Sequence, residues 1–210
     1  MISGSFGNLS SPVDTQIAGG DHIHSGLAGK TGPVVLILDA DLNPNGLGGV
    51  FEPSKNKFQL SAGEIEMLLG REFYVNIHTE NFSSGELRAQ ILPASDSYFQ
   101  AALSGNQEVP AVLSTGEGLV MMELVGNQLF LSGSFSNLNT PFNPNVAMGA
   151  HLHSGLPGEN GGVVYFLETE ITNGNSTSGQ FNVSDNTIIV NDLDELPLLM
   201  DGIMYVNIHS

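Results

Sequence analysis

The chain of 210 residues carries 22 acidic and 5 basic residues, which give a formal net charge of -17, and 40% of its residues are hydrophobic. An acidic surface of this kind repels nucleic-acid phosphates and anionic lipids, which excludes both as expected partners, and it attracts cations. The absence of cysteine excludes disulfides and thiolate metal sites, so a metal must be held by histidine, carboxylate or backbone oxygen.

Short apolar runs separated by Gly, Asn, Ser and Pro predict a chain of short strands and turns. The run 34–38 (VVLIL) predicts a buried strand, and residues 62–69 predict a short helix. Residues 129–135 (LFLSGSF) alternate as a strand does, and residues 192–200 predict a second short helix that Pro197 interrupts. No apolar run approaches the roughly 20 residues needed to cross a bilayer. This pattern predicts an all-β protein of antiparallel Greek-key sandwich or barrel units.

An internal repeat divides the sequence into two copies. Residues 8–27 (NLSSPVDTQIAGGDHIHSGL) align with residues 137–156 (NLNTPFNPNVAMGAHLHSGL). The motif YVNIH occurs at 74–78 and again at 205–209, with two more residues between the motifs in the second copy. A repeat of this length predicts two tandem structural units.

The two copies begin and end at different points of the repeat. We predict copy A at residues 1–93, a linker at 94–97 and copy B at 98–210. Copy A continues into residues 79–93 (TENFSSGELRAQILP), which copy B lacks, whereas residues 98–129 of copy B have no counterpart in copy A. Sheets that lack a strand have open edges, which predicts homodimerisation or strand exchange.

All six histidines lie in repeated motifs, three in each copy: His22, His24 and His78 in copy A, and His151, His153 and His209 in copy B. Side chains alternate between the two faces of a strand, so both histidines of each His-x-His motif project from one face. The third histidine lies on the polar face of the YVNIH strand. Three neutral imidazoles suit copper or zinc and leave a coordination position open. The alternative is a polar seam of hydrogen-bonded histidines that binds no metal.

Two further segments carry candidate functional residues. The acidic run 39–46 resembles a calcium loop, but Pro44 and Val50 stand where that loop needs Gly and Glu, which favours an ordinary acidic loop. Glu86 and Arg88 share a strand face and predict a surface ion pair. The alternative role for Arg88 is to guide anions to a metal.

These motifs together resemble the CHRD domain, a repeat found in the developmental protein chordin and in bacterial extracellular proteins. The resemblance is carried by SGNQEVP at 104–110, by both His-x-His segments, and by residues 74–91, which include GELRAQ. It covers nearly the whole chain and implies an extracellular or periplasmic location. Residues Met1–Phe6 lack the charged and apolar regions of a signal peptide.

The order of His-x-His, a later strand-borne histidine and a Gly-x-x-Arg segment is similar to that of copper/zinc superoxide dismutase. This resemblance implies that the histidines of copy A bind copper and that Arg88 guides the anion. Those of copy B would form an equivalent site without an arginine. The bridging histidine and the zinc ligands of the dismutase have no counterpart here, which implies a three-histidine copper site without a bridged zinc.

Three functions are compatible with these residues. The favoured one is an extracellular metal-binding module that takes two ions per chain, with copper preferred over zinc. The second is a metalloenzyme that performs redox chemistry at copper or hydrolysis at zinc-bound water. Asn76 and Asn207 are the only polar neighbours repeated on the YVNIH strand, and as poor bases they disfavour hydrolysis. The third is a metal-free adhesion or interaction repeat.

Overall fold

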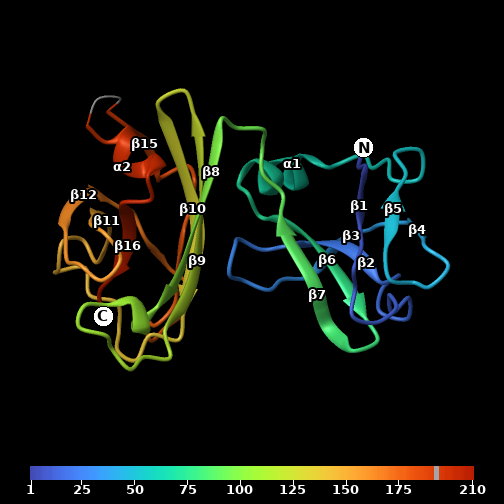
Figure 1. Ribbon diagram of the computed structural model, residues 1–210, viewed down its shortest axis with the longest axis horizontal. Coiled ribbons are helices and arrows are strands. Elements are labelled where there is room, and N and C mark those ends of the chain that lie inside the picture. Colours follow the sequence, from blue (N-terminus) through green and yellow to red (C-terminus); the bar gives the residue numbers. More distant parts are fainter. Residues whose placement is uncertain (192–193) are drawn as a thin grey trace. The chain divides into compact units, whose positions relative to one another are not determined.

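The computed structural model, which describes residues 1–191 and 194–210, divides into unit 1 (Met1–Leu92) and unit 2 (Pro93–Ser210). Both units consist mainly of strands, with only short helices (Figure 1). Within the described residues, no helix combines the length and the apolar character that a membrane span requires. The predicted linker lies next to this boundary, and the first strand of unit 2 begins at Ser97.

Unit 1 contains two antiparallel sheets, in the orders β1-β5-β4 and β3-β2-β6-β7. Its elements are β1 (Gly4–Phe6), β2 (Asp21–Ser25), β3 (Val34–Ile37), β4 (Ala40–Leu42), β5 (Gly49–Phe51), α1 (Ala62–Leu69), β6 (Phe73–Thr79) and β7 (Phe82–Gln90). The core draws on both sheets, because Phe51 of β5 clusters with Ile23 of β2 and Ile77 of β6. Unit 1 is therefore a small sandwich.

Unit 2 has one larger sheet, β13-β14-β10-β9-β8 with β15 also paired to β10, and a second sheet, β12-β11-β16. Its elements are β8 (Ser97–Ser104), the 3-10 turn η1 (Gly105–Gln107), β9 (Glu117–Val125), β10 (Gln128–Ser136), β11 (Ala150–Ser154), β12 (Gly162–Phe166), β13 (Glu170–Ile171), β14 (Gly179–Phe181), β15 (Thr187–Ile189), α2 (Leu196–Met200) and β16 (Met204–Ile208). Leu131, Leu152 and Phe181 are fully buried in its core, and they come from both sheets.

The sequence repeat is also a repeat of strand pairing. In unit 1, β1 pairs with β5 and β2 pairs with β6; in unit 2, β10 pairs with β14 and β11 pairs with β16 in the corresponding registers. The differences lie at the sheet edges. Unit 1 has β7 on the outer edge of β6, whereas unit 2 has the hairpin β8–β9 on β10. Each unit therefore has an edge strand for which the other, in its described residues, has no equivalent.

The predicted all-β fold of antiparallel sandwich units is confirmed, and the described strands of neither unit close into a barrel. The predicted helix at 62–69 is α1, whose first turn is capped by reciprocal hydrogen bonds between Ser61 and Glu64. The second predicted helix is shorter than expected, since α2 begins at Leu196; residues 192 and 193 lie outside the described residues.

Two sequence-based predictions are wrong in detail. The strand at 34–38 forms as β3 but is not buried, with Val34 and Ile37 41% and 57% exposed, because β3 is the edge of its sheet. The acidic run is not wholly a loop, since residues 40–42 form β4. The ammonium group of Lys55 pairs with the carboxylates of Asp39 and Asp41, the two acidic residues of this run.

Asp21 is a buried carboxyl group in unit 1 whose protonation affects the stability of the fold. Its side chain is 3% exposed and lies on the face of β2 opposite His22. Burial, reinforced by the charge of Asp39, raises the pKa of Asp21 to about 6. The folded state therefore binds the proton more tightly than the unfolded chain does, and the carboxyl destabilises the fold progressively as the pH rises from the ordinary Asp value to about 6.

We expect Asp21→Asn to stabilise the metal-free protein by about 1–2 kcal/mol at pH 8, where the wild-type carboxyl is charged. Near pH 4 the difference should disappear, because Asp21 is then protonated in the folded state and resembles the amide. Urea unfolding of both variants at the two pH values measures this. An equal difference at both values would show that burial of the charge is not the cause.

Candidate metal centre

Two adjacent strands bring the three histidines of unit 1 together. His22 and His24 lie on β2 and His78 lies on β6, and the register places Asn76 opposite His22. One ring nitrogen of each histidine lies within 4.8 Å of those of the other two. His22 and His78 are 1% and 6% exposed, and His24 is half-buried. The imidazoles therefore share one focus that is largely shielded from solvent.

Backbone carbonyl groups orient all three rings. The Nδ1 atoms of His24 and His78 lie 2.7 Å from the oxygens of Gly32 and Ser83, and Nδ1 of His22 lies 3.3 Å from that of Ala18. A carbonyl oxygen can only accept a hydrogen bond, so each Nδ1 carries the proton and each Nε2 keeps its lone pair. Histidines that bind a metal through one nitrogen commonly donate from the other in this way.

The Nε2 atoms of His22 and His78 are 3.0 Å apart. With protons on both Nδ1 atoms, two lone pairs face each other, an arrangement that is repulsive unless a cation lies between them. A metal bound at about 2.0–2.1 Å from each nitrogen, with an angle of about 90–110°, places the two nitrogens about 2.9–3.4 Å apart. The third nitrogen, Nε2 of His24, is buried and has no hydrogen-bond partner among the described residues. The geometry therefore fits a bound ion.

A shared proton is the other cation that could occupy this position. Burial lowers the pKa of His22 from its ordinary value, and the neighbouring His24 and His78 lower it further. At neutral pH the environment of His22 thus favours the neutral ring, the form that binds metals. The same burial that disfavours a proton leaves the lone pair available to a metal ion.

Gly32 is a positioning residue that the sequence analysis missed. Its carbonyl orients His24, and a Cβ atom at this residue would lie 1.6 Å from the backbone oxygen of Ser25. Gly161, the equivalent residue of unit 2, meets Ser154 in the same way at 1.5 Å, and its carbonyl lies 2.9 Å from Nδ1 of His153. The repetition of glycine at the second position of TGPVV (31–35) and NGGVV (160–164) was the signal in the sequence.

Tyr74 connects the site to β7. Its ring is stacked on that of His24, with centroids 4.9 Å apart and an interplanar angle of 2°. The guanidinium carbon of Arg88 lies 3.5 Å from the centroid of the same ring, and Arg88 donates a hydrogen bond to the carbonyl of Leu27. This cation–π contact holds Arg88 beside the site.

The predicted ion pair between Glu86 and Arg88 is wrong. Glu86 instead accepts hydrogen bonds from the backbone N–H of Ser10 and the hydroxyl of Thr79. Gly85 and Thr79 lie in the irregular part of the β6–β7 pairing, where the register shifts. This irregularity turns Glu86 toward the segment before β2 and leaves Arg88 on the ring of Tyr74.

Unit 2 repeats most of this arrangement. His151 and His153 lie on β11 and His209 directly follows β16, and the Nε2 atoms of His151 and His209 are 3.3 Å apart. Nε2 of His153 is buried without a partner among the described residues, as it is for His24. Tyr205 stacks on His153 with centroids 4.9 Å apart, as Tyr74 does on His24. His151 therefore contacts both other histidines of unit 2. Among the described residues, however, only the three histidines of unit 1 have ligand nitrogens that all lie within 4.8 Å of one another.

The cluster of unit 2 is looser at its third histidine. The centroids of His151 and His209 are 5.0 Å apart, against 4.7 Å for His22 and His78. No hydrogen bond to Nδ1 of His209 is found among the described residues, whereas the carbonyl that orients His78 belongs to Ser83 of β7. Without that contact the ring of His209 is less firmly positioned than that of His78.

The comparisons agree with the division into two units. The family model of the CHRD domain matches residues 2–91 and 99–210. A search of curated proteins and a search of solved structures each found no match. Each of the two matched segments contains three of the six histidines.

Proposed function

The chain belongs to the CHRD domain family, and we propose that it is an extracellular metal-binding repeat protein with one three-histidine site in each unit. The observation that carries this proposal is the 3.0 Å approach of two Nε2 atoms whose rings both place Nδ1 against a carbonyl oxygen. Coordination of a cation turns this repulsive contact into a favourable one. Three protein ligands also leave a position for water or an anion.

Copper is the preferred ion and zinc the second. Both accept imidazole ligands, and a given nitrogen site binds Cu²⁺ more tightly than Zn²⁺. Each site lacks cysteine, and the net charge of -17 raises the local concentration of cations around the protein. The extracellular location is supported by family membership and by the resemblance to secreted CHRD proteins.

Titration of tag-free, chelator-treated protein with Cu²⁺ or Zn²⁺ tests the proposal. We expect two ions per chain, with the site of unit 1 binding more tightly because all three of its rings are oriented by carbonyl groups. Copper should compete zinc away from both sites. Calorimetry measures the affinity at low and at high ionic strength. Attraction of the ions to surface carboxylates weakens as salt is added, because salt screens it, whereas binding to the histidine sites should persist. If neither ion binds saturably, the metal-free interaction repeat is the better account.

A further inference from the structure

In both units a tyrosine lies directly opposite the second histidine of the His-x-His motif. Tyr74 of β6 pairs with His24 of β2, and Tyr205 of β16 pairs with His153 of β11. Side chains of directly opposite residues lie on one face of the sheet with Cβ atoms about 4.5–5.5 Å apart, which brings each pair of rings into contact. The paired motifs therefore place a tyrosine beside the histidines on the polar face of the two strands.

The tyrosine also contacts the glycine whose carbonyl orients the histidine. The hydroxyl oxygen of Tyr74 lies 3.2 Å from the backbone nitrogen of Gly32 and accepts a hydrogen bond from it. The carbonyl oxygen of the same glycine lies 2.7 Å from Nδ1 of His24. Because the rings of Tyr74 and His24 are stacked, each of the three residues contacts the other two. We call these three residues the Tyr–Gly–His clamp of unit 1.

An irregularity in the strand pairing accompanies these contacts. The register of β2 with β3 shifts between Ile23 and His24, and the register of β11 with β12 shifts directly before His153. A shift of this kind locally disrupts the ladder of backbone hydrogen bonds. The N–H and carbonyl groups of Gly32, which lies just before β3, therefore bond to the side chains of Tyr74 and His24.

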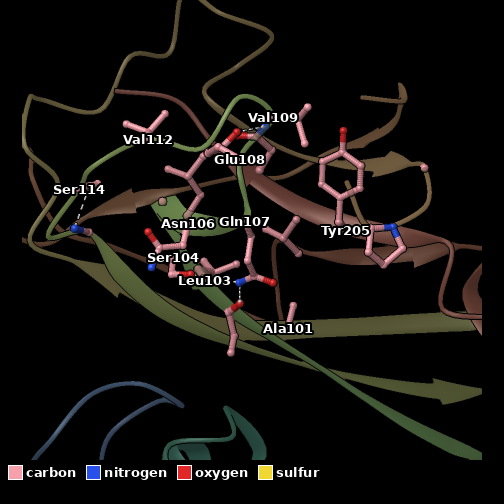
Figure 2. A pocket seen from close by; sticks show the side chains of 18 of the residues that line it. Ala101, Leu103, Ser104, Asn106, Gln107, Glu108, Val109, Val112, Ser114 and Tyr205 are labelled. Carbon is pink, nitrogen blue, oxygen red and sulfur yellow. Dashed lines mark hydrogen bonds between the residues drawn. The ribbon is translucent and has the colours of Figure 1, made fainter. Parts of the chain in front are cut away.

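Unit 2 contains the same clamp. The hydroxyl oxygen of Tyr205 lies 3.1 Å from the backbone nitrogen of Gly161, and the carbonyl oxygen of Gly161 lies 2.9 Å from Nδ1 of His153. The surroundings differ, because Tyr74 is 2% exposed whereas Tyr205 is partly buried and lines a pocket (Figure 2). The same contacts thus form whether the tyrosine is buried or partly exposed.

We propose that Tyr74 and Tyr205 are positioning residues of the two metal sites, an inference that rests on the proposed metal-binding function. Each tyrosine holds a glycine carbonyl in place, and that carbonyl keeps the proton of the histidine on Nδ1. A neutral imidazole protonated on Nδ1 has its lone pair on Nε2, and one protonated on Nε2 has none there. Nε2 is the atom of His24 and of His153 that is buried without a hydrogen-bond partner among the described residues.

His24 depends on the clamp more than the other two histidines of its site depend on the tyrosine. His22 and His78 are 1% and 6% exposed, so the surrounding protein restricts their rings, whereas His24 is half-buried. Its orientation is set by stacking on Tyr74 and by the hydrogen bond to Gly32. Groups that orient a metal-binding histidine in this way typically contribute 10- to 100-fold to metal affinity.

Tyr74→Phe tests the role of the hydroxyl group, because phenylalanine keeps the stacked ring and removes only the acceptor for Gly32. In a His153→Ala background, which leaves the site of unit 1 to be measured, we expect the copper affinity to fall about tenfold. Pulsed electron paramagnetic resonance of the Cu²⁺ protein should show weaker coupling to the third imidazole. Tyr98→Phe is the matched control, since the hydroxyl of Tyr98 also accepts a backbone N–H, that of Ser95.

The tautomer of His24 in the metal-free protein provides a second measurement that needs no ion. At pH 8 in chelator the imidazoles are neutral, and ¹⁵N chemical shifts distinguish a proton on Nδ1 from one on Nε2. We expect Nδ1 to carry the proton in the wild type and a mixture of both tautomers in Tyr74→Phe. Unchanged tautomer and affinity in Tyr74→Phe, or a loss of stability alone, overturn the positioning role. A wild-type protein that binds no copper overturns the metal-binding function, and this inference with it.

Discussion

Replacement of His24 by alanine should abolish tight metal binding in unit 1, with an affinity loss of at least about 100-fold. Its Nε2 is buried without a partner among the described residues, and the other two nitrogens then form only a two-ligand site. A bound ion at 1,000 times its dissociation constant stabilises a fold by about 4 kcal/mol, and this increment should be lost as well. Elemental analysis and thermal unfolding with and without copper measure both effects.

His153→Ala is the matched variant in unit 2. Each single variant should retain one ion per chain, and the double variant should retain none. In chelator, His24→Ala should cost about 1–3 kcal/mol, because the hydrogen bond to Gly32 and the stacking on Tyr74 are lost and no metal contributes. A His24→Ala protein that still binds two ions would contradict the assignment of the site, provided that its metal-free stability is as expected.

Gly32→Ala should destabilise unit 1 by about 2–4 kcal/mol, one of the largest effects expected from adding a single methyl group. The new Cβ would lie 1.6 Å from the backbone oxygen of Ser25, so the loop between β2 and β3 must move. Because the carbonyl of Gly32 orients His24, the same movement should weaken metal binding. Hydrogen exchange resolved by mass spectrometry separates the stability of unit 1 from that of unit 2.

Gly63→Ala is the control for this variant. A Cβ at Gly63 meets no atom within 4 Å, and alanine favours a helix over glycine by up to about 1 kcal/mol. Gly161→Ala should have the same effect on unit 2 that Gly32→Ala has on unit 1, because its Cβ would meet Ser154 at 1.5 Å. If Gly32→Ala and Gly63→Ala were equally stable, the close approach at Gly32 would not be a constraint on the fold.

Several features followed directly from the sequence. The repeat, the short strands and the helix α1 depend on local periodicity or on alignment of one half with the other. The same holds for the grouping of three histidines in unit 1. His-x-His on a strand places both rings on one face because side chains alternate strictly. The polar alternation of YVNIH placed His78 and His209 on the matching face in the same way.

The exposure of β3 and the hydrogen-bond partners of Arg88 and Glu86 could not be predicted without the tertiary structure. An apolar run has the same composition whether its strand lies at the centre or the edge of a sheet. The exposure of Val34 therefore could not be predicted from the residues next to it in the sequence. The irregular pairing of β6 with β7 separates Glu86 from Arg88, although simple alternation would keep them on one face. Pairing irregularities depend on both strands at once.

By itself the sequence determined which residue types could hold a metal and in which two places they recur, because these are properties of motifs and their spacing. Only the tertiary structure decided which nitrogen of each ring faces the shared point. That choice depends on the backbone carbonyl groups of Ala18, Gly32 and Ser83, which lie four to eight residues away in the sequence from the histidines that they orient. Backbone oxygens are the same in every residue, so only folding reveals where they point.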